Sequence, residues 1–391
     1  MIPSKLRFQL VCVWALCLLS FIECRQKGKC LLETDGEPDD MLSLILMAKS
    51  PDVESICAYG VIINLVWPND DKRVFIKQIF KTAGIRLQVL DGANSPHNDK
   101  NLPFNTIDAI SHKILKTELM NLDMKFYILI LAPLRSLSMV LCELKEEHEA
   151  KFDNILEIYW SGGWDPDSYA ADYNLYRDPE HTMKFMNLTA LENKIHISSG
   201  LVSKYPGGMA KETFPKLVEF FTEHMERNDL FKGLIKRQKQ WDQELKALLE
   251  RSSRQELRDI ADGIKGGIQF CPSDILATML MFHPDLRKKE DLMYYTVKVV
   301  KADPHATETT NWDSMKVSVR KDKTQAEKDI KNQRERIEKD EKFNEDEILY
   351  QHQVYTAIND DPDQSKSNFK KRVISLLEKY QSQEQQPVCA Q

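Results

Sequence analysis

The sequence predicts an α/β protein with a mainly parallel, Rossmann-like sheet and helices on both faces. Two observations carry this prediction. Short apolar segments alternate with longer amphipathic segments along most of the chain, which is typical of strands joined by crossover helices. The short segments are also continuous apolar runs, and strands read this way when both faces of their sheet are buried.

The expected strands are the short apolar runs bounded by polar or turn-forming residues. They cover Lys29–Glu33, Val53–Tyr59, Arg86–Leu90, Phe126–Leu131, Ile155–Trp160 and Lys194–Ile197. The amphipathic segments between them predict helices. These cover Met41–Lys49, Asp70–Ala83, Phe104–Asn121, Leu134–Glu147 and Pro179–Leu191. Strand and helix therefore alternate without a break over the first half of the chain.

The second half of the chain changes in character, although we expect residues 25–380 to form one α/β domain. Residues 206–262 hold two segments with apolar residues at helical spacing among many charges, and they predict a helical cap outside the core. Residues 320–347 are highly charged and read as a solvated helix or a flexible insertion. The tail, residues 381–391, is expected to be disordered.

Seven further elements, two of them the cap helices, complete the expected order. An apolar helix over Phe270–Met281 precedes two short β-type runs that read as a hairpin, and a last strand and helix close the domain. The cap helices are Lys211–Asn228 and Leu230–Glu250, the hairpin is Tyr294–Val300 with Met315–Val319, and the closing pair is Val354–Ile358 with Asn368–Tyr380.

Composition and the first residues bound the class of protein. The chain has 391 residues, 42% of them apolar, and its net charge of −6 leaves no basic surplus for binding nucleic acid. Residues 1–24 read as a signal peptide, because Lys5 and Arg7 precede an apolar run, Phe8–Ile22, that is short for a membrane span. An uncleaved signal anchor is the alternative. We therefore expect a secreted or lumenal protein with no stable membrane insertion after cleavage, and the glycosylation sequon at Asn187 fits this location.

Acidic residues crowd the turn that follows the first expected strand. Glu33, Asp35, Glu37, Asp39 and Asp40 lie within eight residues of one another. Five carboxylates at this density repel one another, and a cation or a polyol ligand among them relieves that repulsion. The other interpretation is a solvated acidic loop in which Asp39 caps the next helix.

Polar and turn-forming residues also follow the other expected strands. They are Asn64, Gly92–Asn94, Pro133–Ser136 and Gly162–Gly163, the last leading toward Asp172 and Asn174. Because the carboxyl ends of parallel strands meet at one edge of a sheet, these groups are expected to converge there. Asp274 heads a helix and, taken alone, reads as its N-cap. A carboxylate-rich edge suits Ca²⁺ or a sugar, and suits phosphate poorly because the sequence shows no glycine-rich phosphate loop.

These motifs resemble, in order, those of the nucleoside hydrolase superfamily, the inosine/uridine-preferring N-ribohydrolases. The family opens with D-T-D-P-G-x-D-D, and Glu33–Asp40 reads E-T-D-G-E-P-D-D in the same register. The family's G-x-x-P, G-P-L-T-N, M-G-G, E-F-N-x-x-x-D-P-E-A and H-D-x-x-A resemble Gly92–Pro96, Ala132–Ser136, Ser161–Gly163, Asp172–His181 and Ser273–Ala277. The resemblance thus covers most of residues 28–380 and implies the nucleoside hydrolase fold.

The resemblance also implies a calcium site. Asp35 matches the carboxylate that binds calcium and activates the water, and Asp40 and Asp274 match two further calcium ligands. Arg135 matches the position whose backbone carbonyl ligates the ion, so its side chain is free to vary. The implied reaction is calcium-dependent hydrolysis of the N-glycosidic bond of a ribonucleoside or related N-riboside, which gives ribose and free base.

The implied sugar contacts come from other positions. Asp39 matches the carboxylate that holds the ribose hydroxyls, Asn174 and Asp172 match the residues that contact the sugar, and Asn64 matches the asparagine after the second strand. The implied partner is therefore a small nucleoside or riboside. Whether the chain forms a homo-oligomer stays open.

The chain departs from the family at several positions. Glu33 replaces an aspartate, and glycine and proline have changed places at Gly36 and Pro38. Ser273 stands where purine-preferring members place a histidine acid, and the loop before Asp172 is shorter. Two other hypotheses therefore remain. One is a non-catalytic, metal-stabilised sugar- or nucleoside-binding protein on the same fold, and the other is an interaction protein that binds partners through its charged segments.

Overall fold

The computed structural model contains one nine-stranded sheet with the spatial order β3-β2-β1-β4-β5-β6-β9-β7-β8. The strands are β1 (Lys29–Thr34), β2 (Val61–Ile63), β3 (Val89–Asp91), β4 (Phe126–Leu131), β5 (Ile155–Ser161), β6 (Ile195–Ser198), β7 (Met293–Lys298), β8 (Lys316–Arg320) and β9 (Glu347–Tyr355). The strands from β3 to β9 in this spatial order pair in parallel, and β7 pairs antiparallel with β9 and with β8. The predicted parallel sheet and hairpin are confirmed.

The structure describes a defined part of the chain. The described residues are 28–50, 61–63, 70–84, 88–93, 109–149, 152–163, 174–175, 178–191, 194–198, 219–220, 223–224, 228–250, 273–283, 293–298, 316–320, 324–325, 328, 331–332, 335, 347–355 and 371–378. The expected signal peptide, the tail and two of the predicted site residues, Asn64 and Asp172, lie outside them.

The strand order fixes where a ligand can bind. The run β3-β2-β1-β4-β5-β6 is the doubly wound arrangement, in which the direction of winding reverses between β1 and β4. In folds of this kind, ligands bind at that point, beyond the carboxyl ends of the strands. The switch point therefore lies beside the acidic turn after β1.

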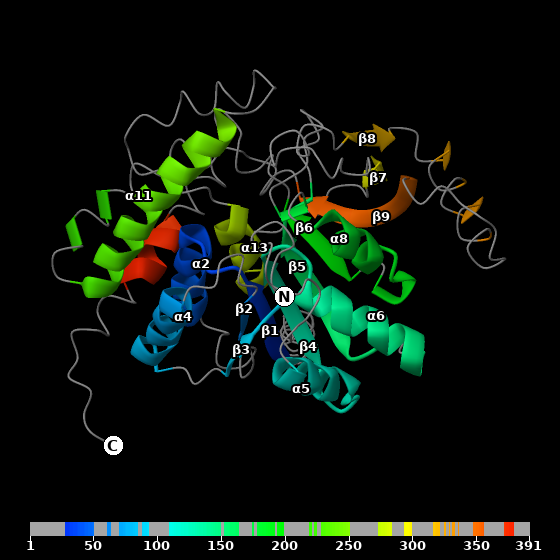
Figure 1. Cartoon of the computed structure of the whole chain (residues 1–391), viewed down its shortest axis with the longest axis horizontal. Helices are drawn as coiled ribbons and strands as arrows, with labels where there is room; N and C mark the ends of the chain where they lie inside the picture. Colours follow the sequence, from blue (N-terminus) through cyan, green and yellow to red (C-terminus); the bar gives the residue numbers. More distant parts are fainter. Residues whose placement is uncertain are drawn as a thin grey trace, which may run out of the picture.

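Helices cover both faces of the sheet (Figure 1). One face is covered by α2 (Pro38–Lys49), α4 (Asp70–Thr82), α11 (Asp229–Leu249) and α13 (Ser273–Phe282), and the other by α5 (Ala109–Met120), α6 (Ser136–His148) and α8 (Pro179–Met186), with a 3₁₀ turn at Thr189–Leu191. Strand β4 shows the layering, because Tyr127, Leu129 and Leu131 belong to the first core. Phe126, Ile128 and Ile130 belong to the second.

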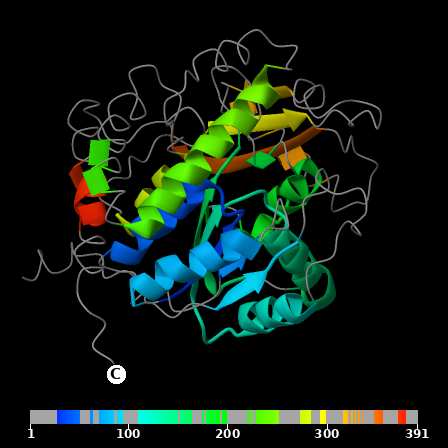
Figure 2. The same ribbon diagram turned by 60° about the vertical axis from the view of Figure 1, so that its left-hand side comes forward.

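The long helix α11 confirms the helix predicted over Leu230–Glu250. Its residues Leu230, Phe231 and Leu234 are buried in the first core, so α11 packs along the outside of α2 and α4 (Figure 2). Gly233 permits this approach, since a Cβ there would lie 2.9 Å from the Phe75 ring of α4. None of the described helices combines the length and apolar character needed to cross a bilayer.

Three element boundaries differ from the predictions. Helix α2 begins at Pro38 instead of Met41, because proline is well suited to the first helical position, and Glu37 rather than Asp39 is the N-cap. The strand beside β1 is Val61–Ile63, further along than the predicted Val53–Tyr59, which lies outside the described residues. Strand β9 begins at Glu347, earlier than the predicted Val354, because it follows β7 along its length.

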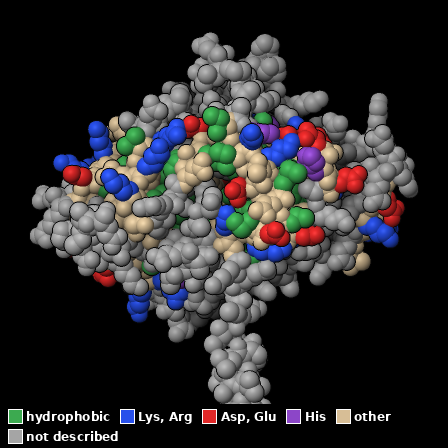
Figure 3. Space-filling model, turned by 90° about the horizontal axis from the view of Figure 1, so that it is seen from below, with side chains coloured by type: hydrophobic (Ala, Val, Ile, Leu, Met, Phe, Trp, Pro, Cys, Tyr) green, Lys and Arg blue, Asp and Glu red, His purple; other side chains and the backbone are tan. Residues whose placement is uncertain are grey.

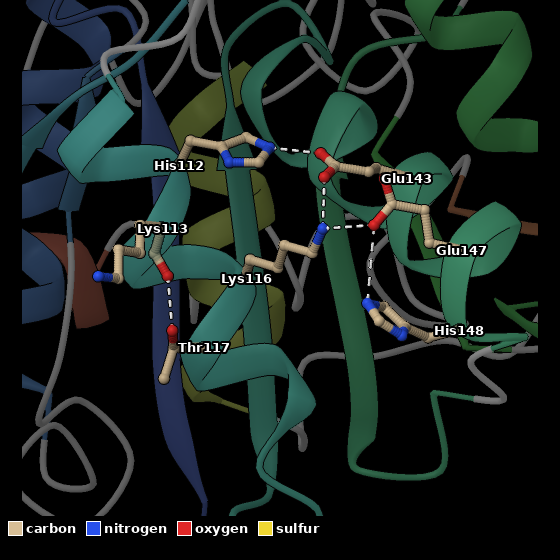
Figure 4. Close-up of polar contacts among 7 residues, drawn as sticks. All are labelled: His112, Lys113, Lys116, Thr117, Glu143, Glu147 and His148. Atoms are coloured by element: carbon tan, nitrogen blue, oxygen red, sulfur yellow. Dashed lines mark hydrogen bonds and ion pairs between the residues drawn. The ribbon is translucent and has the colours of Figure 1, made fainter.

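A polar network on the surface joins α5 to α6 (Figure 4). Lys116 binds Glu143 and Glu147, the latter with 2.8 Å between Nζ and Oε2, and His112 also contacts Glu143. On the face seen from below, described acidic, basic and histidine side chains lie next to one another on the right (Figure 3). Surface pairs of this kind contribute little to stability. The network lies on the face of the sheet opposite to α2 and α4.

Candidate metal and sugar site

A three-residue turn, Asp35–Glu37, connects β1 to α2 at the switch point. Gly36 has φ +67°, a conformation that glycine adopts without steric cost. Its N–H donates to the Thr34 hydroxyl oxygen over 3.1 Å, and the Thr34 hydroxyl donates to a carboxylate oxygen of Asp40. The chain therefore folds back over the end of β1, which places the first turn of α2 above the strand.

Four of the predicted site carboxyls are brought together here. Asp39 and Asp40 from α2 and Asp274 from α13 each offer an oxygen within 4.8 Å of the other two. Asp40 is also hydrogen-bonded to Asp35, and Asp274 is hydrogen-bonded to Ser161 at the end of β5. Asp274 is the second residue of α13 and faces this cluster, so the N-cap interpretation of Asp274 is wrong.

The electrostatics of the cluster favour a bound cation. Burial, followed by repulsion from the neighbouring acids, raises the pKa of Asp35 to about 6 and that of Asp39 to about 8. The same two causes raise the pKa of Asp40 and of Asp274 well above the usual range. Without a cation, the charged form of each of these carboxyls is therefore disfavoured. A divalent ion with oxygen ligands fits this donor set, because it replaces the protons and offsets the repulsion.

Arg135 links the N-termini of α6 and α8 on the other face of the sheet. Its carbonyl accepts the Met139 N–H over 2.9 Å in the first turn of α6. Its guanidinium Nη1 lies 3.3 Å from Asp178 Oδ2, and both side chains are buried. Asp178 in turn accepts the His181 N–H and contacts His181 Nδ1 at 2.9 Å. The ligand role of the carbonyl stays a prediction.

Glu33 makes different contacts from the other acids of this segment. Its carboxylate is fully buried and accepts the N–H groups of Ser136, at 2.8 Å, and Leu137, at 3.3 Å. These N–H groups lie at the N-terminus of α6, where the helix itself supplies no acceptor for them and its dipole also favours a negative charge. The extra methylene of glutamate spans the gap from β1 to α6. Glu33 therefore anchors α6, and Arg135 with it, at the switch point.

Glu33→Ala is expected to lower the free energy of unfolding by about 3–5 kcal/mol, because two charge-assisted hydrogen bonds are lost and two donors stay buried. Urea denaturation measures the change. The control is Glu118→Ala, which removes a partly exposed ion pair to Lys29 at 3.5 Å and should cost about 1 kcal/mol or less. Equal losses in the two variants would contradict the anchoring role.

The predicted sugar residues are placed in part. Asn174 is buried, and its Nδ2 donates to the Ser161 carbonyl over 2.9 Å. Ser161 also binds Asp274, so Asn174 and Asp274 converge on the end of β5. Asn64 and Asp172 lie outside the described residues. The roles of all three sugar residues stay predictions.

Several polar residues at the cluster were not predicted. Thr34 and Ser161 each hold an aspartate, although both lie inside motifs that the sequence analysis singled out. Lys72 of α4 is 1% exposed and binds the turn itself. A signal for its burial was available, because Lys72, Ile76 and Ile79 follow the helical spacing i, i+4, i+7.

Comparison with known proteins gives structural likeness only. No protein-family model matches the chain, and no curated protein sequence matches it. The structure is similar to that of an inosine-guanosine nucleoside hydrolase, with a TM-score of 0.56, 14% identity, and coverage of 90% of this chain and 99% of that one. It is also similar to the effector protein XOO4466, with a TM-score of 0.52, 14% identity and coverage of 93% and 98%.

A further similar structure is the type III effector protein XopQ complexed with adenosine diphosphate ribose. It has a TM-score of 0.50 and 12% identity, with 93% of this chain and 98% of that chain covered. Each comparison spans nearly the whole of both chains, so the likeness includes the sheet and the helices on both faces. The chain therefore has the fold of the nucleoside hydrolases, as its sequence motifs implied.

Proposed function

We propose that the protein is a calcium-dependent N-ribohydrolase, which cleaves the N-glycosidic bond of a ribonucleoside or related N-riboside. One observation carries the proposal. The carboxyl groups of the buried Asp35, Asp40 and Asp274 and of the partly exposed Asp39 form a cluster at the switch point of a sheet with this fold. Ligands of doubly wound folds bind at this place, and buried acids of one sign need a positive partner there.

The ion would be held by oxygen atoms from three parts of the chain. Asp35 and Asp40 come from the turn and α2, Asp274 comes from α13, and the Arg135 carbonyl lies at the start of α6. Carboxylate and carbonyl oxygens are ligands that calcium prefers. When bound, calcium lowers the pKa of a water and orients it toward the substrate.

The residues of the cluster then perform separate tasks. Asp35 takes a proton from the attacking water as a general base, and the Glu37 N–H orients it by donating to Oδ1 over 3.4 Å. The C–N bond breaks with its electron pair going to the nucleobase, the water oxygen bonds to the anomeric carbon of the ribose, and the nucleobase takes up a proton from solvent. The surrounding carboxylates stabilise the positive charge that develops on the ribose. The ribose hydroxyls are held by Asp39, Asn64, Asp172 and Asn174.

Ribose release from a panel of nucleosides tests the proposal. The purified protein is incubated with each nucleoside in the presence of calcium, and again with calcium removed by a chelator. We expect reducing sugar to appear with at least one nucleoside, and only when calcium is present. Absence of release from every purine and pyrimidine nucleoside, with calcium bound, would overturn the hydrolase proposal.

The second candidate function is nucleoside or sugar binding without hydrolysis. Ser273 favours it, because a serine directly before Asp274 is too weak an acid to protonate a departing base. Under this alternative, nucleosides raise the unfolding temperature of the calcium-loaded protein but release no ribose. The two measurements on the same sample therefore separate binding from catalysis.

We also propose that the protein works in the secretory pathway or outside the cell. Residues 1–24 support this location, and the sequon residue Asn187 is exposed at the C-terminal end of α8. Extracellular calcium modules bind the ion with dissociation constants of about 10⁻⁴–10⁻³ M, so a site of modest affinity would be loaded there.

A further inference from the structure

One buried lysine contacts three consecutive residues of the metal-binding turn. The Lys72 ammonium donates to the Asp35 main-chain carbonyl over 3.1 Å and to the Glu37 carboxylate over 2.6 Å. The stem of Lys72 packs on Gly36, since a Cβ there would lie 3.3 Å from both Cβ and Cδ of the lysine. Lys72 of α4 thus contacts every residue of the Asp35–Glu37 turn.

The charges around Glu37 explain how a lysine is kept in the interior. The side chains of Lys72 and Glu37 are 1% and 5% exposed, and a buried charge of either sign is costly unless it is paired. The other carboxylate oxygen of Glu37 lies 3.8 Å from Arg237 Nη2 on α11. Glu37 therefore lies between cations from two helices, which offset part of the repulsion that its charge exerts on Asp35.

The turn needs such a restraint from outside. Gly36 has no side chain to limit its backbone, and glycine has the greatest conformational freedom of any residue. The Lys72 bond fixes the peptide group between Asp35 and Gly36, and the Glu37 N–H meets the Asp35 carboxylate on the other side. Held at both points, the Asp35 side chain is set toward Asp40 before any ligand binds.

We propose that Lys72 is a positioning residue for the metal centre. With Glu37 as its counter-charge, it holds the Asp35–Glu37 turn in the conformation that presents Asp35 to the ion. The inference rests on the calcium centre of the proposed function, but it does not require that hydrolysis occurs. Partners that orient metal ligands typically change metal affinity by about 10–100-fold when they are removed.

The test is the double variant Lys72→Met/Glu37→Gln. It removes both charges together, so neither is left buried without its partner, and Arg237 keeps access to water because it is 23% exposed. The calcium dissociation constant is measured by calorimetry, and the unfolding temperature is measured without metal. We expect the metal-free unfolding temperature to change by only a few degrees, while the dissociation constant rises about tenfold or more.

The α5–α6 network provides the matched control (Figure 4). Lys116→Met/Glu143→Gln removes the same pair of side-chain types from the other face of the sheet, and it should bind calcium as the wild type does. A second variant, Lys72→Arg, keeps the positive charge beside Glu37 but replaces the compact ammonium by a planar group. It should also weaken calcium binding about tenfold if the contact with the Asp35 carbonyl matters. This variant decides the question if the double variant does not fold.

Three outcomes of these measurements lead to different conclusions. Calcium affinity equal to that of the wild type in both the double variant and Lys72→Arg would overturn the proposal, because Lys72 would then only stabilise the fold. A wild type that binds no calcium would overturn the metal centre, and the positioning role with it. A wild type that binds calcium but releases no ribose would overturn the hydrolase proposal, while the change in calcium affinity still decides the role of Lys72.

Discussion

Replacing Asp35 by asparagine is expected to lower the rate of ribose release at least about a hundredfold, since general-base catalysis contributes about 10²–10⁴-fold. Asparagine has nearly the same shape, so the hydrogen bond from the Glu37 N–H at 3.4 Å can persist. It has no basic oxygen to take the proton of the attacking water. Initial rates of reducing-sugar formation at saturating nucleoside measure the loss.

The same variant separates the two roles assigned to Asp35. The amide oxygen of asparagine can still ligate calcium, although more weakly than a carboxylate. Raising the calcium concentration should therefore refill the site in Asp35→Asn without restoring the rate. Full recovery of the rate at high calcium would show instead that Asp35 is a ligand and not the base.

Asp91→Asn is the matched control for this prediction. Asp91 ends β3 at the same edge of the sheet, and its carboxylate is held by Arg73, with Nη1 at 2.8 and 2.7 Å from the two oxygens. The chemical change is identical, but the residue belongs to a half-exposed ion pair. We expect the rate to change by no more than a few-fold.

The fold was predictable because its strands carry a strong local signal. The run FYILIL gave the bounds of β4 correctly, since a strand buried between two helical layers is apolar at every position. Boundaries that depend on neighbours were harder. The strand Val61–Ile63 is set by its pairing with β1, and the start of α2 is set by Pro38 at its first position.

The site was predictable where its residues lie close in sequence. Asp35, Asp39 and Asp40 lie within six consecutive residues, so the motif itself brought them together. The link from Glu33 to Ser136 crosses from β1 to a helix far along the chain, and no local pattern shows it. The burial of Lys72 depends in the same way on the packing of α4 against the turn, which the helical spacing only hints at.

Calcium is expected to stabilise the protein much more at pH 8 than at pH 6. The folded-state pKa is about 6 for Asp35 and about 8 for Asp39, both above the usual value near 4 because of burial. The metal-free folded state therefore binds protons that the unfolded chain releases. The stabilisation that these groups give to the metal-free folded state is therefore lost as the pH rises from about 4 to about 8.

Calcium binding displaces those protons, so the affinity of the protein for calcium rises as the pH rises. Each proton released on binding steepens the dependence by about tenfold per pH unit. Between pH 6 and pH 8 we expect the dissociation constant to fall about tenfold or more. The difference in unfolding temperature with and without calcium, measured from pH 5.5 to pH 8.5, reports this change.

Asp274→Asn tests whether the rise in unfolding temperature on adding calcium comes from binding at this cluster. Asp274 is a member of the cluster from a different element, and its own pKa is raised well above the usual range by burial and by Asp39. The variant loses one charged ligand, so the rise in unfolding temperature on adding calcium should shrink at every pH. An equal calcium effect at pH 6 and pH 8 in the wild type would mean that the ion binds elsewhere, because binding at these buried carboxyls must release their protons.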